Sequence, residues 1–540
     1  MMKKNLLWML AAILTCGLGM SLTSCIDNAD NSGDASVQPE QPYTIVVGEG
    51  MTMPKSLFET ETQFVDGNPA VVNALKAIDG VMDVKVFQIS KGKDYYTNLP
   101  IEKNVYYFNF KQLVDHTDAS KGWFKQQCLL SLAGDYGNNR PTVLHTEGYA
   151  MEEKNNHLSW KSEPMLVSVL NANCLQVEYR YHGWSLPEGW TNNFNYLTAK
   201  QHSADLHAIV TAIKNSGIID KSSKWASTGV SKNGMTTAHY AYYYPNEMDA
   251  YVPFCAPFLL SLRDLRPYTH IVNKQAFDED EQKLEKVKNA FRAFVSDKAV
   301  RAACVPLYRK AKPEYAIYSD EVIHNLLLAE LFDNYYSKMS YVPYALWEPL
   351  IPQAGDPAEK FLAFILANDK TKYDTEKKED YDRRQETVDD LEPDDDLLLA
   401  PRAPRRAAAV ARYDAYYVQS CIELGNYGYD LSWVEDLLTK DEKTYLSNPF
   451  HNPSTFGVTY DGGKFIREFL EGMKQSTCNM MFVYGMQDPW TGGQIPDENL
   501  GPNSQKLFIQ NGRHDDYVDK WNPSERAQLL QWLKGLGFDL

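Results

Sequence analysis

Three residues far apart in the chain, Ser231, Asp488 and His514, have the side-chain types and the order that nucleophilic catalysis needs. Ser231 lies in the stretch STGVSKNG, residues 227–234, between an apolar segment typical of a buried strand and a helical pattern over 235–244. A serine at such a corner can expose its hydroxyl, while backbone N–H groups at the start of the helix face a developing negative charge. The spacing therefore predicts a serine that attacks a carbonyl carbon.

Asp488 directly follows the apolar segment 480–484, and His514 follows the apolar segment 506–509. An imidazole that is hydrogen-bonded to a carboxylate can take the proton of a serine and is stabilised as a cation. Alone, an Asp-Pro pair is usually a turn and a histidine a packed or surface residue. The chain order Ser, Asp, His is that of the α/β-hydrolase fold, so we expect the three side chains to form a triad.

The turn around Ser231 departs from the pattern G-x-S-x-G, because Asn233 stands where the second glycine is expected. An ordinary Gly/Ser turn is the alternative for this stretch alone. An oxyanion site needs a further N–H from a loop after an earlier strand, and residues 146–149, TEGY, fit that place. We expect the backbone N–H groups of Tyr149 and Lys232 to form the oxyanion hole.

Apolar runs alternate with helical patterns from about residue 140 onward, which indicates an α/β protein with a buried parallel sheet. Apolar residues recur at helical spacing over 206–213, as expected for a helix that connects two parallel strands. The buried strands are predicted at residues 142–145, 175–179, 225–228, 250–254, 480–484 and 506–509.

Residues 259–448 differ in character, being rich in Lys and Glu, periodic at 3.6 and without alternating strands. We therefore expect an α/β-hydrolase fold with a large helical cap inserted between the nucleophile and the acid of the triad. The predicted limits are 51–258 and 449–540 for the two parts of the hydrolase domain, and 259–448 for the cap. Within the cap, the acidic and basic runs at 375–396 and 401–406 are expected to be solvated surface, with a partner site as the minority alternative.

The first residues are typical of an export signal, with Lys3 and Lys4 followed by a short apolar stretch over 6–20. The sequence LTSC at 22–25 resembles a bacterial lipobox, which would make Cys25 the lipidated first residue after removal of residues 1–24. An ordinary secretory peptide is the alternative. Residues 25–50 would then form a polar tether, and the protein would be lipid-anchored in the bacterial cell envelope.

Composition excludes several classes of protein. The chain has 540 residues, 44% of them hydrophobic, which is enough for a large core and atypical of a disordered protein. Its net charge of −17 disfavours binding to nucleic acid. Cysteines beyond Cys25 lack the spacing of a zinc site, so no metal or cofactor is expected, while disulfides remain open.

Several blocks of the sequence resemble the secreted prolyl tripeptidyl aminopeptidases, which are serine peptidases related to the lysosomal Pro-X carboxypeptidase group. The resemblance covers most of residues 100–540 and departs from the family at Leu113, Tyr179, Val230 and Asn233. The similar blocks are VDH at 114–116, QQ at 126–127, residues 141–149, VEYRYHGWSLP at 177–187, residues 201–205, the turn at Ser231, DPW at 488–490 and His514.

The resemblance implies hydrolysis of short peptides from a free N-terminus, with proline favoured at the residue whose carbonyl is attacked. A carboxylate beneath the cap would then hold the α-ammonium group of the substrate. Glu423, with Gln419 in the same segment, and Glu178 are the candidates, and a structural ion pair, for instance of Glu178 with Arg180, is the alternative. Aromatic residues could wall a proline pocket or belong to the core; they are Trp184, Trp190 and Trp490.

Two other functions are compatible with the same residues. The triad does not distinguish amides from esters, so an esterase or lipase is possible on this fold. The departure at Asn233 would suit a surface lipoprotein that binds peptides without cleaving them. The favoured prediction is a serine exopeptidase that releases short N-terminal fragments, with peptides as its partners and the membrane contacted through the lipid only.

Overall fold

The computed structural model describes residues 65–89, 103–151, 164–187, 193–367, 415–448, 451–514, 516 and 518–540. The predicted signal, Cys25, the tether and the charged runs of the cap lie outside these residues. Among the described segments, no helix combines the length and apolar composition that crossing a bilayer requires.

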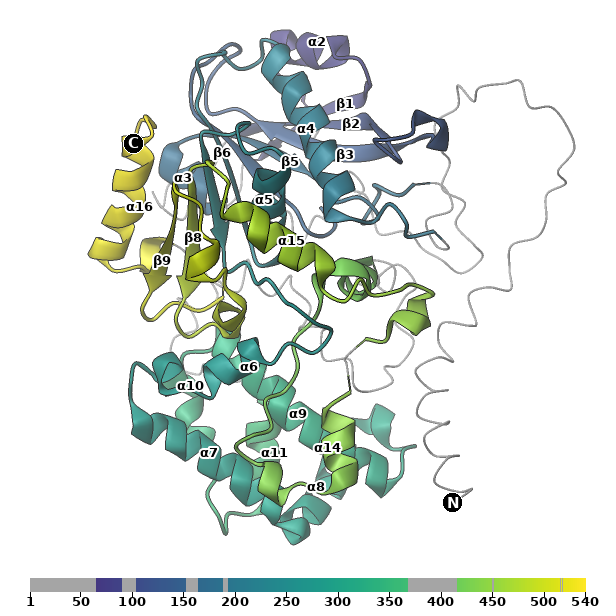
Figure 1. The fold of residues 1–540 in the computed structure, drawn as a ribbon, viewed down its shortest axis with the longest axis vertical. Helices are drawn as coiled ribbons and strands as arrows, with labels where there is room; N and C mark the ends of the chain where they lie inside the picture. Colours follow the sequence, from purple (N-terminus) through teal and green to yellow (C-terminus); the bar gives the residue numbers. More distant parts are fainter. Residues whose placement is uncertain are drawn as a thin grey trace, which may run out of the picture.

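A nine-stranded sheet in the order β1-β2-β3-β5-β4-β6-β7-β8-β9 forms the body of the molecule (Figure 1). Strands β1, β2 and β3 are antiparallel, and the strands from β5 to β9 are parallel to one another. The bounds are β1 (Val81–Ile89), β2 (Lys103–Leu113), β3 (Trp123–Ser131), β4 (Thr142–Thr146), β5 (Asn173–Val177), β6 (Trp225–Val230), β7 (Ala250–Phe254), β8 (Met480–Gly485) and β9 (Ser504–Ile509). The six predicted strands are thus all present, and β5 begins and ends two residues earlier than predicted.

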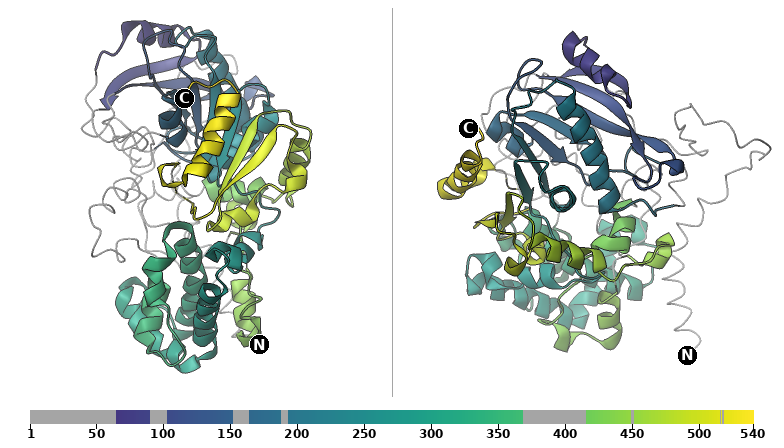
Figure 2. Two further views of the ribbon diagram at one scale, coloured as in Figure 1. Left: turned by 90° about the vertical axis from the view of Figure 1, so that its left-hand side faces the viewer. Right: turned by 45° about the horizontal axis from the view of Figure 1, so that its top comes forward.

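Helices cover both faces of this sheet (Figures 1 and 2). On one face, α4 buries the predicted residues at 206, 209, 210 and 213 in a core shared with α2, α5 and α15. On the other face, α3 and α16 pack against a second core. The bounds are α2 (Pro69–Ala77), α3 (Met165–Leu170), α4 (Ala199–Asn215), α5 (Lys232–Tyr243), α15 (Lys464–Met473) and α16 (Pro523–Gly535). This arrangement is the α/β-hydrolase fold.

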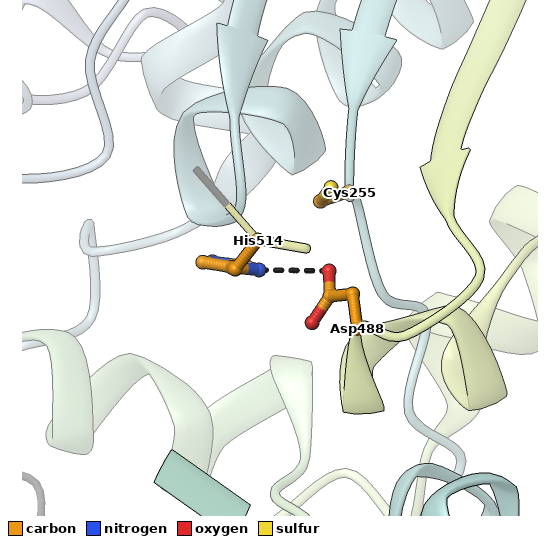
Figure 3. A group of neighbouring side chains, drawn as sticks. All are labelled: Cys255, Asp488 and His514. Atoms are coloured by element: carbon orange, nitrogen blue, oxygen red, sulfur yellow. Dashed lines mark hydrogen bonds and ion pairs between the residues drawn. The ribbon is translucent and has the colours of Figure 1, made fainter. Parts of the chain in front are cut away.

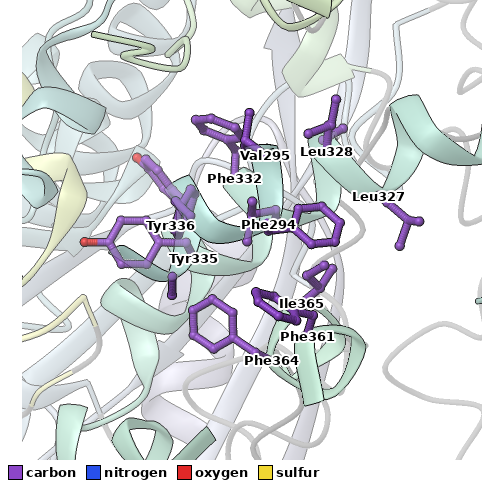
Figure 4. Packing of buried hydrophobic residues seen from close by; sticks show 14 of the residues in the cluster. Phe294, Val295, Leu327, Leu328, Phe332, Tyr335, Tyr336, Phe361, Phe364 and Ile365 are labelled. Carbon is purple, nitrogen blue, oxygen red and sulfur yellow. The ribbon is translucent and has the colours of Figure 1, made fainter. Parts of the chain in front are cut away.

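The described residues of the predicted cap, 259–367 and 415–448, lie between β7 and β8, contain helices but no strand, and have an apolar core of their own (Figure 4). The long helix α9 runs through this core, where Phe332 and Tyr335 are fully buried. Helices α7, α8 and α9 each begin at a capping Asp or Ser whose side chain accepts a backbone N–H. The bounds are α6 (Arg266–Ile271), α7 (Glu281–Ser296), α8 (Lys298–Ala311), α9 (Asp320–Tyr341), α10 (Tyr344–Trp347), α11 (Ala358–Leu366) and α14 (Lys440–Leu446).

A buried ion pair between Arg180 and Asp205 ties the loop after β5 to α4. Both side chains are 0% exposed, and the guanidinium donates at 2.8 and 2.7 Å to the two carboxylate oxygens. Burial alone would raise the pKa of Asp205, but the charge and hydrogen bonds of Arg180 hold it well below its usual range. Asp205→Ala should lower the free energy of unfolding by about 3–5 kcal/mol, because it leaves a buried cation unpaired.

Urea denaturation measures this loss, and the chain offers a matched control in the bidentate pair of Arg292 with Asp436. That pair has similar distances, 2.8 and 2.7 Å, but its side chains are 41% and 60% exposed. Since water screens exposed charges, Asp436→Ala should change the unfolding midpoint far less. Equal losses in the two variants would contradict the importance of burial.

Candidate active site

Ser231 occupies a strained corner between β6 and α5. Its backbone has φ 59° and ψ −124°, a positive-φ conformation that non-glycine residues seldom adopt. The neighbouring glycines allow this turn: a Cβ at Gly229 would meet the backbone of Asn233 at 2.6 Å, and one at Gly234 the carbonyl oxygen of Phe254 at 2.5 Å. Strand, sharp turn and helix follow each other as predicted, so the serine lies at the carboxyl end of a central strand.

Asn233, which departs from the glycine pattern, connects this turn to the loop after β4. Its Oδ1 accepts the N–H of Gly148 at 2.6 Å, and its Nδ2 donates to Glu147 at 3.0 Å. A glycine at this position could make neither bond. The departure therefore adds a tie between the serine turn and the predicted oxyanion loop, and it leaves the strained corner in place.

Asp488 and His514 meet above the sheet, from the ends of β8 and β9 (Figure 3). Nδ1 of His514 lies 2.8 Å from Oδ2 of Asp488, and the two side chains are 7% and 0% exposed. The other oxygen, Oδ1, accepts the N–H of Trp490 at 3.1 Å and so begins the short helix Pro489–Gly493. The carboxylate is thus held by its own turn while it orients the imidazole.

The strand order brings Ser231 to the same edge. β6, β7, β8 and β9 are consecutive and parallel, so the residues after each of them share the carboxyl edge of the sheet. The N–H of Ser231 donates to the carbonyl of Phe254 at 2.9 Å, and the next residue, Cys255, lies beside Asp488. These contacts lead from the serine turn, across the end of β7, to the carboxylate and imidazole.

Cys255 is a member of this cluster that the sequence analysis did not single out. One ligand atom each of Cys255, Asp488 and His514 lies within 4.8 Å of the others, and all three side chains are buried (Figure 3). A thiolate, carboxylate and imidazole can hold zinc. Burial and the adjacent Asp488 raise the pKa of the Cys255 thiol well above its usual value, however, so the group is suited to donate to the carboxylate as a neutral thiol.

The cap touches the loop that carries His514 directly. The backbone N–H of His514 donates to the carbonyl of Ser340, near the end of α9, at 3.0 Å. The ring of Tyr341 stands edge-on to the imidazole with centroids 5.7 Å apart. The cap therefore forms part of the support of the imidazole as well as covering it.

The predicted oxyanion loop lies against the start of α5. The N–H of Gly148 is bonded to Asn233, so it does not face an oxyanion. The next N–H along the loop, which is the predicted donor, is that of Tyr149. Lys232 is the first residue of α5, and its side chain is buried under this loop, with Nζ 2.5 Å from the carbonyl oxygen of Gly148. Both predicted donors thus lie on segments that contact each other beside Ser231.

Glu178 needs a correction, because its surroundings suit neither predicted role. Its carboxylate is 0% exposed, and Arg180 pairs with Asp205 instead. Five protein donors at 2.7–3.0 Å already bind the Glu178 carboxylate: Oε2 accepts the N–H groups of Trp184 and Ser185, the hydroxyl of Ser185 and Nε2 of Gln127, and Oε1 accepts the N–H of Met151. Glu178 is therefore fully buried and bonded to the loops around it, which suits a structural role.

Glu423 lies in the helical turn Ser420–Leu424, where the chain returns from the cap. Its Oε1 accepts the N–H of Ala199 at 2.7 Å, at the start of α4, and Nε2 of Gln419 at 3.0 Å. Burial raises the pKa of Glu423 to about 7, against these hydrogen bonds and the positive charge of Lys232. Oε1 of Gln419 is buried with no hydrogen-bond partner among the described residues, so the two side chains together present acceptors for a cation.

Trp490 stands beside the imidazole, within a group of tyrosines from the cap. Its ring centroid is 6.3 Å from that of His514 and 5.4 Å from those of Tyr336 and Tyr427. Trp184 instead lies in the loop held by Glu178, and Trp190 is outside the described residues. The cap tyrosines had no sequence signal, since tyrosines are frequent along the whole chain.

No disulfide joins any two of the six cysteines in the described part of the chain, which are Cys128, Cys174, Cys255, Cys304, Cys421 and Cys478. All six are buried. Their thiols therefore contribute to packing, as expected for most of them.

Comparison with known proteins gives a family model, PS-10 peptidase S37, that matches residues 75–323. The chain is 25% identical over 435 residues to prolyl tri/tetrapeptidyl aminopeptidase of Streptomyces mobaraensis, covering 78% of this chain and 79% of that protein. Among solved structures, proline iminopeptidase of Mycobacterium smegmatis is 12% identical, covering 76% of this chain and 95% of that one, with a TM-score of 0.37. Epoxide hydrolase A of Mycobacterium thermoresistibile is 14% identical, covering 77% and 97%, with a TM-score of 0.30.

Proposed function

We propose that this chain is a serine peptidase of the family that includes prolyl tri/tetrapeptidyl aminopeptidase, and that it releases short N-terminal peptides through an acyl-enzyme on Ser231. Proline is the proposed residue at the carbonyl that is attacked. The observation that carries the proposal is the 2.8 Å contact of Asp488 with His514 at the sheet edge where the strained Ser231 turn lies.

In the proposed mechanism, Oγ of Ser231 attacks the peptide carbonyl while Nε2 of His514 takes its proton. Asp488 holds Nδ1–H and stabilises the imidazolium. The N–H groups of Lys232 and Tyr149 bind the oxyanion of the tetrahedral intermediate. His514 then protonates the leaving amine, and water, deprotonated by the same imidazole, hydrolyses the ester and restores Ser231.

Selection of a free N-terminus is proposed for Glu423 and Gln419, and the aromatic group of Trp490, Tyr336 and Tyr427 is proposed as the wall of a proline pocket. An ammonium has three N–H donors, and the carboxylate and the unpartnered amide oxygen of Gln419 can accept them. The distance from these acceptors to Ser231 would set the length of the released peptide.

Mass analysis of the fragments from an unblocked peptide with proline at its third position tests the proposal. The expected product is the N-terminal tripeptide, with no cleavage of the N-acetylated peptide. Cleavage of both peptides at equal rates, or hydrolysis of a simple acyl ester only, would contradict it.

Glu423→Gln should raise KM for an unblocked peptide amide by about 10- to 100-fold, the worth of a charged hydrogen bond, with little change in kcat. Since burial raises the pKa of Glu423 to about 7, this carboxyl is neutral at pH 5 and ionised at pH 8. In the wild type KM should therefore fall as the pH rises through about 7, until the α-ammonium itself deprotonates near pH 8. In the variant this fall should be absent.

The matched control is Glu247→Gln, because Glu247 is also a hydrogen-bonded carboxylate but lies beyond the far end of α5 from Ser231. Its KM and pH profile should match the wild type. An unchanged profile in Glu423→Gln would assign that residue to capping of α4 alone.

We also propose that Cys25 carries the lipid and that residues 1–24 are removed, which would place the enzyme in the cell envelope. The sequence LTSC at 22–25 supports this. The N-terminal mass of the purified mature protein tests it: a diacylated Cys25 is expected, and an unmodified N-terminus would refute it.

A further inference from the structure

The two residues after Ser231 hold the two peptide groups that flank Gly148. Oδ1 of Asn233 accepts the N–H of Gly148 at 2.6 Å, and Nζ of Lys232 donates to its carbonyl oxygen at 2.5 Å. That carbonyl belongs to the same peptide group as the N–H of Tyr149. We propose that the Lys232 side chain is a positioning residue that aims and polarises the Tyr149 N–H toward the oxyanion, an inference that rests on the proposed function.

Three aromatic rings surround the amine of Lys232. Its Nζ lies 4.0 Å from the ring centroid of Tyr179, 5.3 Å from that of Tyr149 and 5.4 Å from that of Tyr416. Aromatic faces attract a cation but accept no strong hydrogen bond. Among the described residues the carbonyl oxygen of Gly148 is the hydrogen-bond acceptor recorded for this amine.

Burying a lysine amine is costly, so the position calls for an explanation. The residue is 2% exposed, and burial lowers the pKa of Lys232 well below its usual value, opposed by the charge of Glu423. No carboxylate lies within ion-pair distance of Nζ among the described residues. A leucine or methionine would fill the same space without that cost, so packing alone does not account for the lysine.

The physical effect follows from the peptide group. A donor on the carbonyl oxygen polarises the amide and strengthens the hydrogen bond that its N–H gives. The substrate carbonyl carries little charge before attack, so the stronger hydrogen bond stabilises the transition state more than the bound substrate. It should therefore raise kcat.

The arrangement also gives the loop a fixed orientation. Asn233 and Lys232 hold consecutive peptide groups from one helix start, so the loop cannot rotate about Gly148 without breaking one of the two bonds. A Cβ at Gly148 would come within 2.7 Å of the Lys232 side chain, which shows how closely the loop is seated. The nucleophile turn and the oxyanion loop thus form one unit.

Lys232→Met tests the proposal in the full-length protein, since methionine keeps the length and removes the donor. We expect kcat for an unblocked proline peptide amide to fall about 10- to 100-fold, part of the 10²–10³-fold loss for removal of a whole oxyanion donor, with KM little changed. Lys232→Arg restores a donor and should recover most of the loss. If the Met variant does not fold, Lys232→Gln is measured in the same way.

Two further measurements separate polarisation from a structural role. In the Ser231→Ala background, the Kd of the intact peptide should be the same with and without Lys232→Met, because ground-state binding does not use the effect. A peptide boronic acid, which forms a tetrahedral adduct with Ser231, should bind the Lys232→Met variant of the active enzyme more weakly by the same factor as the loss in kcat.

Lys214→Met is the matched control. Lys214 also donates to a backbone carbonyl, that of Glu247, and lies over an aromatic ring, that of Trp225, at 5.0 Å. Trp225 is the first residue of β6, at the opposite end of the strand from Ser231. This variant should keep the wild-type kcat.

An unchanged kcat in a folded Lys232→Met variant, or an equal loss of peptide affinity in the Ser231→Ala background, would overturn the proposal. Failure of the proposed function looks different: wild-type activity of Ser231→Ala, or no adduct of the boronic acid with the wild type, would show that Ser231 is not the nucleophile.

Discussion

Replacing Ser231 with alanine should lower kcat for an unblocked proline peptide amide by at least about 10³-fold, since the variant lacks the oxygen that forms the acyl-enzyme. The fold should be retained, because the Ser231 side chain makes no capping hydrogen bond to α5. Alanine keeps the Cβ that the positive-φ backbone at 59° already accommodates. The thermal midpoint should therefore change little.

Fluorophosphonate labelling provides an independent readout of the same residue. The wild type should gain one covalent adduct, mapped to Ser231, and the variant should gain none. A matched control is Ser227→Ala, earlier on β6 and fully buried, which should keep both labelling and turnover. Turnover by Ser231→Ala at the wild-type rate would refute the assignment of the nucleophile.

Asp488→Asn should lower kcat by about 10³- to 10⁴-fold while the site stays assembled. The amide can still accept the N–H of Trp490, but at His514 it can no longer fix the tautomer in which Nε2 is free to accept the serine proton. It also cannot stabilise the imidazolium. KM should change much less than kcat, because the Asp488 side chain is fully buried.

Steady-state kinetics and the thermal midpoint together check this prediction. Asp249→Asn serves as control: Asp249 accepts a backbone N–H from Trp225 at 2.9 Å, but at the amino end of the sheet, away from the site. Activity within a few-fold of the wild type in Asp488→Asn would mean that another group orients His514.

The sequence predicted the parts of the fold that depend on local pattern. Each predicted parallel strand contains a cluster of apolar residues, and each strand is present, because strands buried on both faces are predominantly apolar. The end of β5 was predicted two residues too late. The pattern of the sequence continues through Glu178 and Tyr179, but the pairing of β5 with β4 ends where β4 itself ends, at Thr146. Local pattern does not reveal where a neighbouring strand ends.

Pairings across long stretches of chain could not be predicted. Gly148 and Asn233 are hydrogen-bonded although they lie 85 positions apart in the sequence. From the sequence alone, Asn233 at the position of a glycine only weakens the motif, because its partner Gly148 is not apparent. Glu178 looked available for a ligand because its donors come from remote segments, among them Gln127 and Met151. Cys255 carried no signal at all, since only the sheet order brings it to Asp488.

The hydrogen bond from the N–H of His514 to the carbonyl of Ser340 ties the helical layer to the loop that carries the imidazole. Exchanging the cap for that of a relative, or trimming it to admit longer peptides, would therefore also remove a contact that holds His514 in place. Engineered broadening of substrate range should therefore keep the last turn of α9 intact, even though that turn lies far from the supported residue in the sequence.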